Sequence, residues 1–148
     1  MRRTFQSPLV VAIAVLGCSQ IADQGKSPSV GYWSRAVGFV DSGGIFTSPL
    51  VAPDTVQAGV GFTVTVSTFG SSACIRPDQS EVQLDGSVAS ITPYDSVWSN
   101  NPPCPGDWRG HPRPVELRFD AGGSARIELH GRGFDHDLTL ERTIIVQP

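Results

Sequence analysis

Apolar residues in this chain recur at every second position, in short runs bounded by turn-forming residues. The clearest run covers residues 62–67, where Phe62, Val64 and Val66 alternate with hydroxyl-bearing side chains. A period of two places successive side chains on opposite faces of a β-strand. The 148 residues include 16 Gly and 12 Pro, and both types destabilise a helix interior. Because the length suits one small domain, the sequence predicts a single all-β unit.

The first residues have the pattern of an export signal. Arg2 and Arg3 precede an apolar run over residues 9–17, as the charged and apolar regions of such signals do. The run is too short to span a bilayer, which takes about 20 residues in a helix. Residues 15–18 read Val-Leu-Gly-Cys and resemble the lipobox of bacterial lipoproteins. The resemblance implies cleavage after residue 17 and lipidation of Cys18; the alternative is a free or paired Cys18.

These features divide the chain into three parts. Residues 1–17 are expected to be a signal peptide, 18–29 a lipidated cysteine with a flexible polar tether, and 30–148 the folded domain. The resemblance implies a membrane-anchored lipoprotein of the bacterial cell envelope, in the outer membrane or facing the periplasm. The net charge of −3 and the lack of a basic stripe argue against nucleic acid as a partner.

Two further cysteines remain in the exported part. An even pair in an oxidising compartment favours a disulfide between Cys74 and Cys104. A metal site is the weaker interpretation, because these cysteines lack the paired spacing of a closed tetrahedral ligand set.

Residues 81–92 have the pattern of a β-hairpin. The pair Asp85-Gly86 is expected to form a two-residue turn, which would place Leu84 opposite Ser87 and Val82 opposite Ala89. In that arrangement Val82, Leu84, Ala89 and Ile91 share one face.

A second hairpin is expected to join residues 115–119 to residues 123–130. A three-residue loop over 120–122 would place Glu116 opposite Arg126, whereas a five-residue loop would oppose Glu116 to Glu128, a repulsive pair. The first register is therefore predicted. Further strands are expected within 32–40, 45–56 and 138–146.

Seven to nine strands without helices favour two antiparallel sheets packed face to face, a β-sandwich. Residues 53–66, with an Ala-Gly turn before an alternating strand, resemble the opening strands of bacterial immunoglobulin-like domains. Residues 123–129 and 143–146 look like the last two strands of that architecture. The resemblance implies an immunoglobulin-like sandwich. Cys74 and Cys104 fall outside its central strands, so no inter-sheet disulfide of the antibody type is implied.

The stretch from Tyr94 to Pro114 is predicted to be a long loop that the disulfide constrains. Rigid aromatic side chains make good contact surfaces, so Tyr94, Trp98 and Trp108 are candidate contacts for a glycan or a protein ligand. The structural alternative, which is favoured, is that the two tryptophans cap one end of the domain.

Signals for catalysis or a cofactor are weak. No GxSxG motif occurs. A metal site is conceivable among five residues near the C-terminus, but a solvated turn is the favoured reading and no metal or cofactor is expected. These residues are His111, His130, Asp135, His136 and Asp137.

The expected function is that of a non-catalytic binding or structural module displayed on the membrane surface. The alternative is an accessory or catalytic subunit acting on polysaccharide, for which Asp95, Asp107 and Glu116 are the candidate carboxylates.

Overall fold

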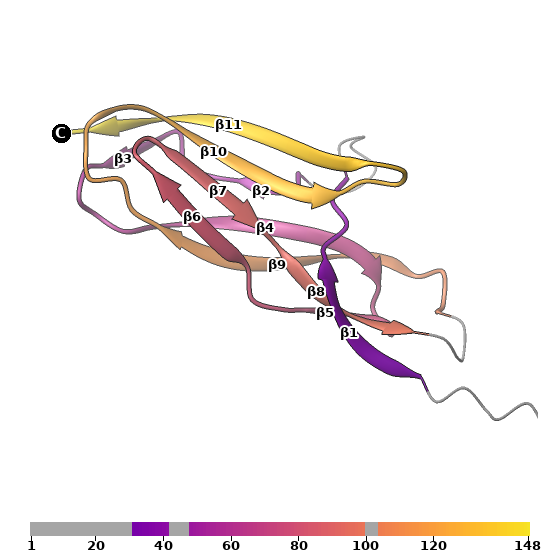
Figure 1. Ribbon diagram of the computed structural model, residues 1–148. Helices are drawn as coiled ribbons and strands as arrows, with labels where there is room; N and C mark the ends of the chain where they lie inside the picture. Colours follow the sequence, from indigo (N-terminus) through magenta and orange to yellow (C-terminus); the bar gives the residue numbers. More distant parts are fainter. Residues whose placement is uncertain (1–30, 42–47, 100–103) are drawn as a thin grey trace, which may run out of the picture.

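A computed structural model describes residues 31–41, 48–99 and 104–148 of the chain. This part is all-β, with eleven strands in three sheets and no helix (Figure 1). No helix that could cross a membrane lies in the described ranges. The prediction of an all-β chain is confirmed, whereas seven to nine strands in two sheets is wrong. The signal peptide, Cys18 and the tether lie outside the described residues.

The largest sheet has five strands in the order β3-β11-β10-β7-β6. Strands β10 and β11 form a long antiparallel hairpin, but β7 runs parallel to β10 and β3 parallel to β11. Parallel neighbours need a crossover connection, so the chain leaves this sheet after β7 and returns at β10. The strand bounds are β3 Thr55–Gln57, β6 Glu81–Asp85, β7 Val88–Thr92, β10 Gly123–Arg132 and β11 Asp137–Gln147.

A second sheet, in the order β2-β4-β9, contains Leu50–Val51, Phe62–Ser71 and Trp108–Leu117. The alternating run that begins at Phe62 is a strand, as predicted, and it continues to Ser71. Val64 and Val66 are fully buried on its inner face.

One hydrophobic core joins these two sheets. It takes side chains from β4 and β9 on one side and from β7, β10 and β11 on the other, as an alternating pattern requires when one face of each sheet is buried. The most deeply buried members are Val40, Val64, Val66, Ala89, Ile91, Ile127, Leu129 and Ile144.

The third sheet, β1-β8-β5, consists of Tyr32–Val37, Tyr94–Ser99 and Ile75–Pro77. The prediction of a long loop from Tyr94 to Pro114 is wrong, because both ends of that stretch are β-strands. Strand β8 pairs with β1 and β5, and β9 pairs with β4. After β1 the chain continues through Phe39, which bridges to Arg132 of β10.

The hairpin β6–β7 forms where the sequence predicts it, but the predicted register is wrong. Leu84 lies opposite Ala89 and Val82 opposite Ile91, so the loop is Gly86-Ser87. Gly86 has φ 57°, the positive value that two-residue hairpin turns need at their first loop position. The observed register pairs apolar residues with each other instead of Leu84 with Ser87.

The predicted hairpin of residues 115–130 is wrong. Strand β9 pairs with β4, and β10 pairs with β11 and β7, so the connection crosses from one sheet to the other. Glu116 therefore lies opposite Thr63, and its carboxylate accepts a hydrogen bond of 2.5 Å from the Thr63 hydroxyl. The alternating pattern predicts correctly which side chains of β9 and β10 are buried. The two strands belong to different sheets, however, so these side chains enter the core from opposite sides.

Candidate functional site

The disulfide between Cys74 and Cys104 is present, with the two Cα atoms 5.8 Å apart. It lines an apolar cavity of about 250 Å³ beside the end of β4 and the start of β9. Figure 1 shows these strand ends at the end of the molecule opposite the C-terminus. Phe39, Phe69, Ile75, Val97 and Trp108 are also in the lining. The covalent link fixes the short segment before β9 against the end of β4.

Three aromatic rings from distant parts of the chain meet beside this cavity. The Phe39 ring lies 5.2 Å from Trp108 and 4.6 Å from Phe134, measured between centroids. Phe39 is buried, but Trp108 is 44% exposed and Phe134, between β10 and β11, is 76% exposed. We call Phe39, Trp108 and Phe134 the aromatic end. Exposed clusters of this kind mark interaction surfaces more often than single apolar residues do.

Polar groups flank the aromatic end. Asp107 accepts hydrogen bonds from the hydroxyls of Ser71 (2.8 Å) and Ser72 (2.6 Å) and pairs with Arg109 at 3.6 Å. The hydroxyl of Ser72, then that of Ser71, and the charge of Arg109 lower the pKa of Asp107 below its ordinary value. The segment before Trp108 is thus held by hydrogen bonds as well as by the disulfide.

Tyr94 and Trp98, the other predicted contact residues, lie elsewhere, on β8. Trp98 is opposite Trp33 with 5.4 Å between ring centroids, and the Arg76 guanidinium stacks on Trp33 at 4.0 Å. The Arg35 guanidinium covers the Tyr94 ring at 3.6 Å. Other side chains of the protein therefore cover the rings of Tyr94 and Trp98. This favours the capping interpretation for Trp98, and Trp108 is the more accessible tryptophan of the two.

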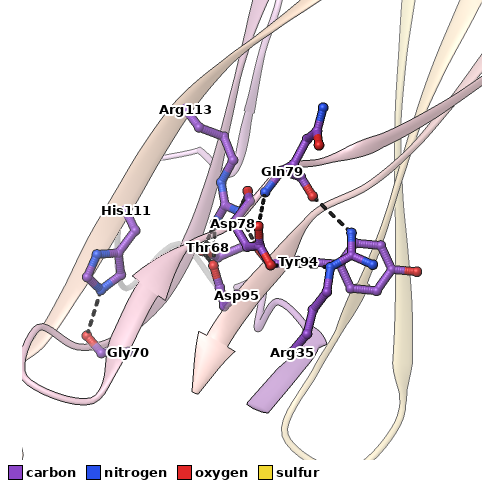
Figure 2. Close-up of polar contacts among 9 residues, drawn as sticks. All are labelled: Arg35, Thr68, Gly70, Asp78, Gln79, Tyr94, Asp95, His111 and Arg113. Carbon is purple, nitrogen blue, oxygen red and sulfur yellow. Dashed lines mark hydrogen bonds and ion pairs between the residues drawn. The ribbon is translucent and has the colours of Figure 1, made fainter. Parts of the chain in front are cut away.

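A buried ion pair lies between the sheet β2-β4-β9 and the sheet β1-β8-β5 (Figure 2). Arg113 donates to Asp95 at 2.5 Å, and both side chains are almost fully buried. Thr68 donates to the same carboxylate oxygen at 2.9 Å and accepts from Arg113. Arg113 also donates to the backbone carbonyls of Asp78, at 2.8 Å, and Tyr94. These contacts join β4, β8 and β9, so the pair connects the sheets instead of facing solvent.

The three candidate carboxylates do not form a catalytic pair. Asp95 is committed to the buried ion pair, and Asp107 and Glu116 lie at opposite ends of β9. At about 3.4 Å per residue, nine positions separate them by roughly 30 Å, whereas glycosidases hold their two carboxyl groups within about 10 Å.

The histidines are also dispersed. His111 contacts the carbonyl of Gly70 at 3.3 Å, His130 contacts the Thr139 hydroxyl at 3.0 Å, and His136 contacts Asp135. Among the residues that the structure describes, no group of three or more His, Cys, Asp or Glu side chains could hold a metal ion.

No family model, no curated protein and no solved structure matches this chain.

Sequence reasoning found Trp108 but missed its partners Phe39 and Phe134. Each is an isolated aromatic residue in its own segment, and no local pattern indicates that they meet. The one available signal was Gly-Phe at 133–134, an apolar residue inside a predicted turn, where a solvated residue is the usual choice.

Proposed function

We propose that this protein is a non-catalytic binding module of the bacterial cell envelope, anchored to a membrane through a lipid on Cys18. Its ligand, a protein or a glycan, contacts the aromatic end. The observation that carries the proposal is the exposure of Trp108 and Phe134 against the buried ring of Phe39, beside a cavity that a disulfide holds in place. The likeness to immunoglobulin-like domains belongs to the same proposal.

The physical argument is one of preorganisation. A ligand that buries exposed aromatic rings gains apolar contact area. Because the disulfide and the bonds to Asp107 already restrain the segment before Trp108, little further conformational entropy is lost on binding. A role in polysaccharide cleavage has less support, since its candidate carboxylates are far apart or buried.

Ligand contact at the aromatic end can be tested by photo-crosslinking in cells that export the protein. A photoreactive residue at position 108 or 134 should capture one recurrent partner, and the same residue at Thr143, an exposed site on β11, should not. Trp108→Ala should abolish capture from position 134 without lowering the melting temperature appreciably. Trp98→Ala should destabilise the fold instead. Equal capture from all positions, or unfolding of both variants, would remove the support for a recognition surface.

The anchor requires its own measurement. Growth with radiolabelled palmitate should label the wild-type protein, and Cys18→Ser should abolish the label and release the protein from the membrane fraction. A labelled Cys18→Ser protein would contradict lipidation at this residue while leaving the binding proposal intact.

A further inference from the structure

The two sheets that share the hydrophobic core are unequal, and the larger one extends past the smaller one at β6. Five strands face three, and β6 is the last strand of the five. Val82 and Leu84 lie on the same face as Ala89 and Ile91, which are completely buried, yet Val82 is 36% and Leu84 52% exposed. The core-facing side of β6 is thus partly uncovered.

The hydrogen-bonding groups on the outer edge of β6 are also free of any described strand. Asp85 and Val88 close the two-residue turn and bond to each other, so alternate residues of β6 point toward β7. The bond from the Arg126 amide to the Ser87 carbonyl supports this alternation. The backbone groups of Val82 and Leu84 therefore point away from the sheet, where another strand can pair with them.

The facing edge, on β9, is blocked by proline. The amides of Ser67 and Phe69 bond to Pro49 and Phe39, away from β9, so the outward positions of β9 include Pro112 and Pro114. Proline has no amide hydrogen and is a common device against edge pairing. A strand entering this side of the domain would consequently pair with β6 and not with β9.

A cavity of about 260 Å³ lies between the start of β6 and β9, lined by Ser80, Val82, Arg113, Val115 and other residues. Side chains of a strand paired with β6 would point into this space on alternate positions. The cavity thus offers an inserted segment contact with Val82 and Val115.

The negative charges around the outer edge of β6 favour a basic partner segment. Glu81 and Asp85 lie on the opposite face from Val82 and Leu84, and Glu116 lies across the gap on β9. No ion pair to these three carboxylates occurs in the described part of the chain. A second copy of β6 paired antiparallel about Gln83 would place Glu81 opposite Asp85, a repulsive pair.

We infer that β6 is a docking edge for an extended, basic segment of a partner protein. The segment adds a sixth strand to the sheet, with two apolar residues beside Val82 and Leu84 and basic residues opposite Glu81 and Asp85. Backbone pairing supplies affinity, and the alternating side chains supply specificity, as in other strand-addition complexes. This surface is separate from the aromatic end, so the inference does not depend on the proposed function.

A labelled peptide with the core Lys-Val-Thr-Val-Lys tests the inference by fluorescence anisotropy, using the full chain as the cell processes it. The core reads the same in both directions, so it suits either strand orientation. Binding should be saturable, and it should slow hydrogen exchange of the Val82 and Leu84 amides. The composition-matched core Lys-Lys-Thr-Val-Val should bind at least about tenfold more weakly.

Peptide backbone controls separate strand pairing from charge attraction. In the antiparallel orientation the valine amides face β6 and the threonine amide faces away, so N-methylation of both valines should abolish binding and N-methylation of the central threonine should leave it unchanged. In the parallel orientation the threonine amide faces β6, and the two results should be exchanged. Equal binding of both N-methylated peptides, or of the reordered peptide, would overturn the inference.

Protein variants locate the site. Leu84→Lys should weaken binding about tenfold or more, and the control Ile145→Lys, at a residue of similar exposure on β11, should not. The pair Glu81→Lys and Asp85→Lys should switch preference to a Glu-Val-Thr-Val-Glu core, a gain that unfolding cannot mimic. No peptide binding, or β6-dependent dimerisation that excludes the peptide, would overturn the inference.

Discussion

Arg113 and Asp95 form an ion pair of 2.5 Å in which the side chains are only 8% and 1% exposed. Arg113 belongs to β9 and Asp95 to β8, so the pair joins the third sheet to the core. Thr68 and two backbone carbonyls add hydrogen bonds to the pair, whereas Asp95 Oδ2 and Arg113 Nε are buried without a partner among the described residues. A buried pair of this kind costs much desolvation free energy, and its loss exposes the partner's charge to an apolar surrounding.

Arg113→Met should therefore lower the free energy of unfolding by about 3–5 kcal/mol, because Asp95 is left buried and unpaired. Urea denaturation measures the effect. The matched control is Arg118→Met, which removes an exposed pair with Asp120 and should cost at most about 1 kcal/mol. Adding Asp95→Leu to Arg113→Met should recover part of the loss, and strictly additive losses would contradict the pairing.

Gly38 marks a close approach of the chain to the same ion pair. A Cβ atom there would lie 2.3 Å from Thr68 Cγ2 and 2.9 Å from Asp95 Oδ2. Since both neighbours are buried and cannot move aside, Gly38→Ala should destabilise the domain by about 1–3 kcal/mol. Gly106→Ala, with no atom within 4 Å of its Cβ, is the control for thermal melting. Equal melting temperatures would place Gly38 outside the packed region.

The disulfide closes a loop with a sequence separation of 30. Replacing both cysteines, Cys74→Ser with Cys104→Ser, should cost about 3–4 kcal/mol, mostly by freeing the unfolded chain. The urea midpoint should fall without a change of fold, and a reducing agent should shift the wild-type protein by the same amount. A reductant-sensitive double variant would show that another bond is responsible.

The ionisation of Asp107 makes the stability of the fold depend on pH. Because the pKa of its carboxyl is lower in the folded state, the ionised form stabilises the protein at neutral pH. That contribution is lost as the pH falls through the folded-state pKa. Ser72→Ala should raise the pKa of Asp107 toward its ordinary value, which a carboxyl ¹³C titration measures. Ser72→Thr keeps the hydroxyl and should preserve the low pKa; an unchanged value in both variants would contradict the assigned cause.

Sequence periodicity predicted where the strands lie in the chain better than it predicted which strands pair with each other. The run from Phe62 was recognisable because alternation reports which face is buried. It carries no information about which strand lies alongside, so Val115 and Ile127 were expected to pair within one hairpin when they pack from different sheets. The shift in the β6–β7 register has a similar origin: moving the turn by one residue, from Asp85-Gly86 to Gly86-Ser87, shifts the cross-strand pairing by two residues and so preserves the same faces.

The candidate site was only partly predictable for the same reason. The disulfide follows from counting cysteines, and Trp108 from an unusual local composition. Phe39, Phe134 and Arg113 derive their roles from contacts with residues far along the chain. Arg113 lies between two prolines in an exposed-looking segment, and nothing local indicates that its charge is buried against Asp95.

The parallel pairing of β7 with β10 determines the order in which the domain can fold. The hairpins β6–β7 and β10–β11 form from nearby residues, but they join only after the chain has passed through β8 and β9. Pairing across such separations slows folding. Both cysteines precede β10, so a chain that emerges N-terminus first can close its disulfide before the five-stranded sheet is complete. Formation of the disulfide would then hold the start of β9 against the end of β4. Fewer conformations of the chain would remain to be searched before the five-stranded sheet is complete.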